Sequence, residues 1–268
     1  MKSGALLLAV ALLQPTPEPS LEQLLGRLSA YLTRYEPLIS EVIADEVMTQ
    51  RDRFTSLRNP VSRKLTSEIA FMRLPGGGEW MGFRLVRAVN GRAVNDQQTL
   101  LQQLLSATGD EYRRGLAIAL ESARHNLGVS RTTNVPLLAF HLLHPRNRER
   151  FTYEKHVLER VAGRQLRRID FTERMSPTVI QTSQGDDVPS RGSIWFDEAT
   201  GAVYETVVLD RDGGPAQLRV TFTMDNALGI LVPQRMREVF PLSGAVGEGD
   251  ARYSNFRRFT TSARIVPN

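Results

Sequence analysis

The chain has 268 residues, of which 41% are hydrophobic and 24% charged, and its formal net charge is +5 at pH 7. This composition is typical of a folded protein that buries its own core. The chain contains no cysteine, which excludes disulfides, thiolate metal sites, iron–sulfur clusters and a cysteine nucleophile.

The first residues resemble an export signal. An apolar run, GALLLAVALL at residues 4–13, follows Lys2 and precedes a proline-rich stretch at residues 14–19. A membrane-spanning helix needs about 20 apolar residues, so the run is better explained as the apolar centre of a signal peptide. We therefore expect residues 1–19 to be a signal peptide with a proline spacer, no transmembrane span after this leader, and a periplasmic or secreted protein. An uncleaved N-terminal anchor is the alternative.

The next segment has the pattern of an amphipathic helix. Ser20 and Gln23 have the spacing of a capping box, and apolar residues then recur every three or four positions across residues 21–35. We expect Pro37 to kink this helix. The apolar stripe continues beyond the proline, which predicts that the helix ends near residues 45–48.

Three carboxylates would lie close together at the end of this helix. Glu41 and Asp45 would share a face, with Glu46 beside them. They could form a carboxylate pair for a metal ion or for acid–base chemistry, in a hydrolase that also uses His125 or Arg124. Alternatively, they form a solvated helix face or salt bridges to arginines. The sequence has no G-x-S-x-G, P-loop, dinucleotide-binding or zinc-protease motif, so we predict no catalytic residue and no cofactor.

The middle of the chain changes from strands to helices. Residues 65–74 and 80–89 have the pattern of two strands, and Asn90-Gly91 is a strong hairpin signal. Helical patterns follow over residues 96–143. His141 and His144 could face one side of a helix and hold a metal ion. No third ligand has a useful spacing, so we expect packed or surface histidines and no metal site.

After residue 150 the pattern is that of an antiparallel meander. Short extended runs with turn residues between them recur about every ten positions. The predicted strands are residues 151–157, 165–173, 178–183, 192–197, 202–209, 216–224, 230–240 and 251–260. Residues 218, 220, 222 and 224 are apolar and alternate with polar ones, which gives that strand one apolar and one wet face. Because strands flank the helices on both sides, we expect one α+β domain over residues 20–268.

The positive charge is spread along the chain. Arginines cluster only locally, at residues 113–114, 146–150, 167–168 and 257–258, and acidic residues interleave with most of these. A nucleic-acid groove concentrates basic charge and adds aromatic residues for stacking, so we predict no nucleic-acid partner. A weak attraction to anionic lipid head groups or to a cell-envelope polymer is left open.

Three motifs near the C-terminus resemble the last strands of LolA-like periplasmic lipoprotein carriers. They are W-x-D-x-x-T-G at residues 195–201, L-V-P at residues 231–233 and Y-S-N-F at residues 253–256. Before these strands the resemblance is one of architecture only. It implies a curved antiparallel half-barrel sheet of the α+β class, with helices on its concave face.

The resemblance also implies a function for the space between sheet and helices. It predicts an exported bacterial envelope protein, without catalysis, that binds a lipid-like ligand or an acylated protein there. No residue of this chain can be matched to lipoprotein hand-off. The alternative is an interaction or scaffold protein that binds an envelope protein and no small ligand. The residues expected to form the apolar binding face are Trp195, Leu218, Val220, Phe222, Met224, Leu24 and Leu28.

Overall fold

The structure is a computed structural model. It describes residues 18–40, 42–54, 61–73, 80–94, 117, 119–128, 131–182, 184–210, 216–242 and 244–258. The elements named below are α1 (Leu21–Ile39), β1 (Val42–Phe54), β2 (Val61–Arg73), β3 (Trp80–Val89), β4 (Arg92–Ala93), α4 (Leu138–Leu142), the 3-10 helix η2 (Pro145–Arg150), β5 (Phe151–Val161), β6 (Arg164–Glu173), β7 (Ser190–Phe196), β8 (Val203–Asp210), β9 (Gln217–Asp225), β10 (Ile230–Leu242) and β11 (Ala245–Arg258).

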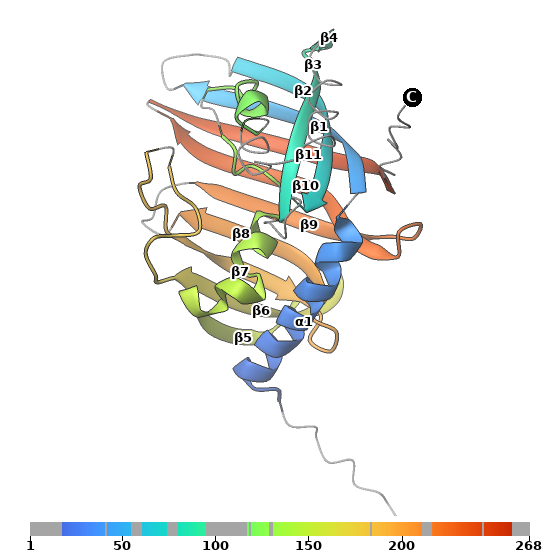
Figure 1. Cartoon of the computed structure of the whole chain (residues 1–268), viewed down its shortest axis with the longest axis vertical. Helices are drawn as coiled ribbons and strands as arrows, with labels where there is room; N and C mark the ends of the chain where they lie inside the picture. The colour runs from blue at the N-terminus through green and yellow to red at the C-terminus, as the bar shows by residue number, and fades with distance from the viewer. Residues whose placement is uncertain are drawn as a thin grey trace, which may run out of the picture.

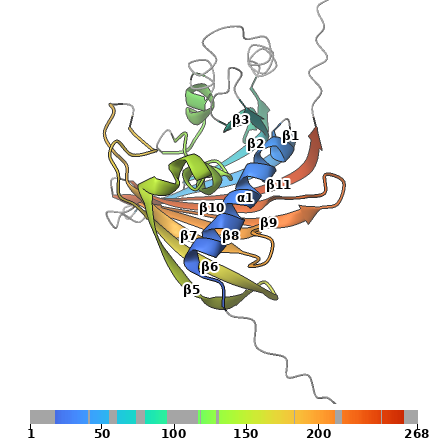
Figure 2. The ribbon, with the colours of Figure 1, turned by 60° about the horizontal axis from the view of Figure 1, so that its bottom comes forward.

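All eleven of these strands form one antiparallel sheet. Its order is β4-β3-β2-β1-β11-β10-β9-β8-β7-β6-β5, so neighbours in the sheet are neighbours in the chain except where β1 pairs with β11. The sheet curves, and within the described residues its edges are β4 and β5, which do not pair with each other (Figures 1 and 2). The prediction of a curved antiparallel half-barrel of the α+β class is confirmed.

Helix α1 and part of the connection from β4 to β5 cover the concave face, here called the inner face (Figure 2). Because β4 and β5 are opposite edges of the sheet, the chain between them must cross from one side to the other. This connection carries α4 and η2. It also includes a helical turn at residues 119–123. Of the helical segment predicted for residues 96–143, residues 96–116 lie outside the described part of the chain.

Helix α1 begins as predicted and ends earlier than predicted. The capping box of Ser20 and Gln23 is present, and the last turn closes where the N–H of Ser40 donates to the carbonyl of Glu36 at 3.0 Å. Two residues later β1 starts, so the expected continuation of the helix to residues 45–48 is wrong. The inward residues of β1 include buried Glu46 and Gln50. These polar residues hide the apolar alternation that would reveal a strand.

Most predicted strands of the C-terminal half are present, with two differences. Residues 178–182 form bends with a single bridge, Gln181 to Asp187, instead of a strand. The carboxylate of Asp187 accepts hydrogen bonds from the hydroxyl of Ser176 and the N–H of Thr178. These bonds pair polar groups within the loop and lower the pKa of Asp187 to about 2. In addition, β11 begins six residues earlier than predicted. Its early inward position is Gly247, where a side chain would overlap the ring of Phe240.

Candidate functional site

The predicted apolar face and the predicted helix meet in one core. Leu24 and Leu28 of α1 are 0% and 3% exposed and pack in the same cluster as Leu218, Val220 and Phe222 of β9. Apolar side chains at alternate positions of a strand face the same side of the sheet. Both groups therefore contribute to the same core.

Aromatic rings fill the space between the helices and the sheet. Phe140 of α4 stacks on Phe222 of β9 with ring centroids 5.1 Å apart, and Tyr35 of α1 packs edge-on against Phe140, also at 5.1 Å. A small cavity between α1 and α4 measures about 20 Å³, which is the size of a single water site. The inner face beneath α1 is therefore packed.

Two of the predicted face residues lie elsewhere. Trp195 belongs to a separate cluster with Leu166 and Val207, and its indole N–H donates to Glu159 Oε2 at 2.8 Å. Its strand neighbours Ile194 and Phe196 face the core, so Trp195 points to the opposite side, here called the outer face. Met224, at the end of β9, is 50% exposed. Neither residue joins the cluster beneath α1.

An open groove lies at the rim of the inner face. This rim groove measures about 170 Å³ and lies between residues 131–138 of the connection, the loop at residues 180–190, and the ends of β8, β9 and β10. Its apolar lining includes Leu138, Ile180, Val208, Ala216, Leu218 and Phe240. Leu218 is thus the one predicted face residue that reaches both the packed core and the groove.

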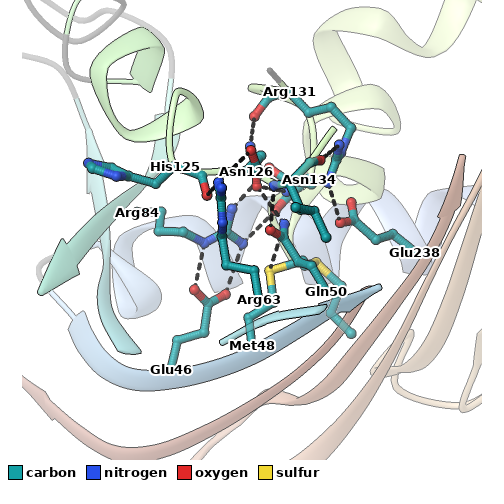
Figure 3. A network of polar contacts seen from close by, with 12 residues as sticks. Glu46, Met48, Gln50, Arg63, Arg84, His125, Asn126, Arg131, Asn134 and Glu238 are labelled. Carbon is teal, nitrogen blue, oxygen red and sulfur yellow. Dashed lines mark hydrogen bonds and ion pairs between the residues drawn. The ribbon is translucent and has the colours of Figure 1, made fainter. Parts of the chain in front are cut away.

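A buried ion pair anchors the connection that forms one wall of this groove (Figure 3). Arg84 of β3 and Glu46 of β1 are 5% and 0% exposed, and they form two hydrogen bonds of 2.5 and 2.9 Å. Arg84 also donates to the side-chain and backbone oxygens of Asn134, at 2.9 and 2.8 Å. Burial disfavours the charged guanidinium, but the Glu46 carboxylate overcomes this and keeps the pKa of Arg84 above its usual value.

Amides extend the network along the connection (Figure 3). Gln50 of β1 donates to Asn126 at 2.7 Å and accepts from the backbone N–H of Leu127 at 2.8 Å. At the far end, Arg131 donates to Glu238 of β10 at 2.9 Å and lies 3.5 Å from the ring centre of Phe240. Asn126, Leu127, Arg131 and Asn134 are therefore fixed to β1, β3 and β10 by paired polar groups.

One buried carboxyl near this network is only partly satisfied. Asp52 of β1 is 2% exposed, and its Oδ1 has no hydrogen-bond partner among the described residues. Burial raises the pKa of Asp52, and the positive charges of Arg131 and Arg63 offset part of that effect. Because the folded-state pKa is raised, the protonated carboxyl adds stability at low pH that is lost as the pH rises through this pKa.

Replacing Asp52 by Asn removes this pH dependence. We expect D52N to unfold at a higher urea concentration than the wild type at pH 7. The difference should vanish below about pH 3.5, where the wild-type carboxyl is protonated in both states. Urea unfolding followed by circular dichroism at both pH values measures it.

Asp45 is the control for D52N, because its pKa is shifted in the opposite direction. Hydrogen bonds from Asn255 and Arg257 hold its pKa below the usual value despite some burial. D45N should therefore lower stability slightly at pH 7, with the loss disappearing as the pH falls. If D52N and D45N change the stability at pH 7 in the same direction, the pKa of Asp52 is not raised, or that of Asp45 is not lowered, as described.

The carboxylates proposed for a hydrolase do not converge. Asp45 and Glu46 are adjacent in β1 and point to opposite faces, Asp45 toward Arg257 on the outer face and Glu46 toward Arg84 on the inner face. Glu41 lies outside the described residues. Arg124 pairs with Glu121 instead. The expected cluster of carboxylates on one helix face is wrong, because the segment is a strand.

The two histidines lie beside α1. His144 Nε2 is 3.1 Å from Glu36 Oε2, and its Nδ1 accepts from Arg146 at 3.0 Å. His141 lines the same small cavity. Within the described ranges, no three His, Cys, Asp or Glu side chains gather as metal ligands would. We also find no helix there whose length and apolar character would let it cross a membrane.

The W-x-D-x-x-T-G motif forms the turn that supports α1. The carboxylate of Asp197 accepts from the N–H and the hydroxyl of Thr200, at 2.8 and 2.7 Å. Gly201 follows with φ +76°, and a Cβ there would overlap the carbonyl oxygen of Arg27 in α1. Arg27 in turn donates to the carbonyl of Glu198 at 2.8 Å. The motif thus docks the helix closely on the β7–β8 turn.

These observations define a class of protein: an open antiparallel half-barrel with helices packed on its inner face. No protein-family model matches the sequence, and no curated protein matches it. Several solved structures do match it.

Three such structures cover most of the chain. An outer membrane lipoprotein-sorting protein domain from Vibrio parahaemolyticus is 10% identical, with a TM-score of 0.44 over 90% of this chain and 94% of that one. A DUF1329 family protein from Desulfovibrio piger is 11% identical, with a TM-score of 0.43 over 89% and 94%. A LolA superfamily protein from Nitrosomonas europaea is 11% identical, with a TM-score of 0.33 over 90% and 97%. The similarity is remote and concerns the fold alone.

Proposed function

We propose that this protein is an exported envelope protein that binds a hydrocarbon chain, from a lipid or an acylated protein, in the rim groove. The observation that carries this proposal is the groove itself, which is open while the inner face beneath α1 is packed. Apolar side chains of β8, β9 and β10 form its floor, and Leu138 contributes to the opposite wall.

The apolar lining of the groove suits a hydrocarbon chain. Burying hydrocarbon contributes roughly 0.8 kcal/mol for each methylene removed from water, so even a short stretch of acyl chain would bind measurably. Leu218 lies where the groove meets the core. Past Leu218, a longer chain would have to enter the packed core that Val220 and Phe222 share with α1 and α4. Leu24 and Leu28 then become ligand contacts only when the helix moves.

Export to the periplasm or beyond is part of the same proposal. It rests on the leader pattern of residues 1–19 and on the carrier-like motifs of the C-terminal strands. A carrier of hydrocarbon chains is needed where lipids or acylated proteins cross an aqueous space. The proposed location and the proposed ligand therefore support each other.

Filling the groove with a larger side chain tests the ligand site. We expect the wild type to bind a fluorescent long-chain fatty acid, and A216F to bind it about tenfold more weakly. This is the effect of losing about two buried methylenes, at about 0.8 kcal/mol each. Titration of the probe, and native mass spectrometry of protein purified from a membrane-rich host, measure it. The matched control is A227F, at an exposed turn position outside the groove. Equal weakening in both variants, or no binding by the wild type, contradicts the proposal.

A second candidate is a protein-interaction role without a small ligand, which the packing between α1 and the sheet favours. Leu24 and Leu28 are buried between the helix and the sheet. In that case native mass spectrometry finds no bound lipid, and the acyl probe does not bind. Cross-linking in the cell envelope should then recover one specific protein partner.

A further inference from the structure

A second groove crosses the outer face of the sheet, opposite the helices, and four arginines line it. It measures about 640 Å³ and lies over β1, β9, β10 and β11. We call it the arginine groove, and its arginines are Arg219, Arg235, Arg237 and Arg252. It shares no lining residue with the rim groove.

Strand register brings these arginines together. Arg219 of β9 lies directly opposite Arg237 of β10, and Arg235 of β10 lies directly opposite Arg252 of β11. Side chains at directly paired positions share a face of the sheet, and adjacent strands are about 4.8 Å apart. The four arginines therefore lie close together on one face of three neighbouring strands.

Such an arrangement is unfavourable in the isolated protein. Like charges directly opposite each other destabilise a sheet, and here two arginine pairs occur side by side. Asp250 accepts two hydrogen bonds from Arg235, and Glu205 accepts one from Arg219. Four arginines and two carboxylates leave a net charge of 4 − 2 = +2.

The arginines also remain accessible to a ligand. The side chains of Arg219, Arg235 and Arg237 are 43%, 31% and 57% exposed, and Arg252 is exposed as well. Val47 of β1 lies beside Arg252 and is 42% exposed. An apolar side chain within a cationic array is suited to a surface that carries both anionic groups and hydrocarbon.

We propose that the arginine groove docks the protein on an anionic lipid surface by binding phosphate head groups. The planar guanidinium binds phosphate oxygens through paired hydrogen bonds, and four arginines staggered over three strands can hold several phosphates that lie side by side. Binding through the outer face leaves the rim groove of the inner face free. The docking surface and the proposed hydrocarbon site are therefore independent.

Vesicle binding tests the proposal. We expect the wild type to sediment with phosphatidylcholine vesicles that contain phosphatidylglycerol and to ignore vesicles of phosphatidylcholine alone. R237Q/R252Q should partition about 30-fold more weakly, which corresponds to about 1 kcal/mol for each arginine. Arg237 and Arg252 are replaced because Arg219 and Arg235 form closer ion pairs, with Glu205 and Asp250, than Arg237 does. The matched control is R34Q/R160Q, which removes the same charge at exposed positions outside the groove.

The outcomes of vesicle binding distinguish docking through the arginine groove from binding by net charge, by a free anion or by an acidic protein. Selective loss in R237Q/R252Q, with binding that weakens as salt rises, supports the proposal. Equal loss in the control double variant overturns it, because net charge alone then explains binding. Competition by low concentrations of inorganic phosphate would assign the site to a free anion, and preference for polyglutamate would assign it to an acidic protein. Either result contradicts the proposal that the arginine groove docks on a lipid surface. Should the double variant melt early, R252Q alone serves as the folded test.

Discussion

Replacing Glu46 by Gln is expected to lower the free energy of unfolding by about 3–5 kcal/mol, because it leaves the buried guanidinium of Arg84 without its counter-charge. The pair is nearly inaccessible to solvent, so water cannot replace the lost carboxylate. Arg84 also holds Asn134. We therefore expect the connection over the inner face to loosen together with the pair. Urea unfolding followed by circular dichroism measures the change.

A surface ion pair provides the comparison for this variant. Arg53 and Glu248 are 61% and 38% exposed at a separation of 3.0 Å. Removing one member of such a pair costs about 1 kcal/mol or less, so E248Q should unfold almost as the wild type does. If E46Q and E248Q are destabilised equally, the ion pair at Glu46 is not the buried anchor that we describe.

The second large effect is expected at Gly201. Alanine there must adopt a positive φ, which costs about 1–2 kcal/mol. Its Cβ would also press on the backbone of α1 at Arg27 and Leu28, which adds about 1–3 kcal/mol of overpacking. We expect G201A to lose about 3 kcal/mol in total and to detach α1 from the β7–β8 turn. Hydrogen exchange of the α1 amides reports this detachment.

Gly163 allows the two contributions to be separated. It also has a positive φ, +82°, but a Cβ there has open space around it. G163A should therefore show the backbone cost alone, with unchanged exchange of α1. If G163A is destabilised as much as G201A, close packing against the helix does not explain why a glycine follows Thr200.

The elements that were predicted correctly have regular apolar patterns. Helix α1 has both its cap and its apolar stripe in sequence, and β9 alternates without interruption from Leu218 to Phe222. In contrast, β1 buries Glu46, Gln50 and Asp52, and the partners of Glu46 and Gln50 lie far along the chain. Until Arg84 and Asn126 are placed beside them, such residues have the pattern of an exposed segment. Local patterns cannot reveal a strand whose inward face is polar.

The candidate sites also differ in whether a local sequence pattern reveals them. Leu218 could be found because it belongs to an alternating strand, whereas the rim groove depends on how residues 131–138 dock. Trp195 lies next to a register shift in the pairing of β7 with β8, and it faces outward. The arginine groove has no local signature at all. Its four arginines come from three strands, and only cross-strand register makes them neighbours.

The pairing of β1 with β11 has a consequence for how the protein folds. Asp45 and Asn255 are 210 positions apart in the chain and form a hydrogen bond of 2.7 Å near the centre of the sheet. Contacts of such long sequence separation form slowly, because much of the chain must become ordered before they close. The strands on either side of this seam can assemble as two separate hairpin arrays. Joining them is therefore expected to be the slow step of folding.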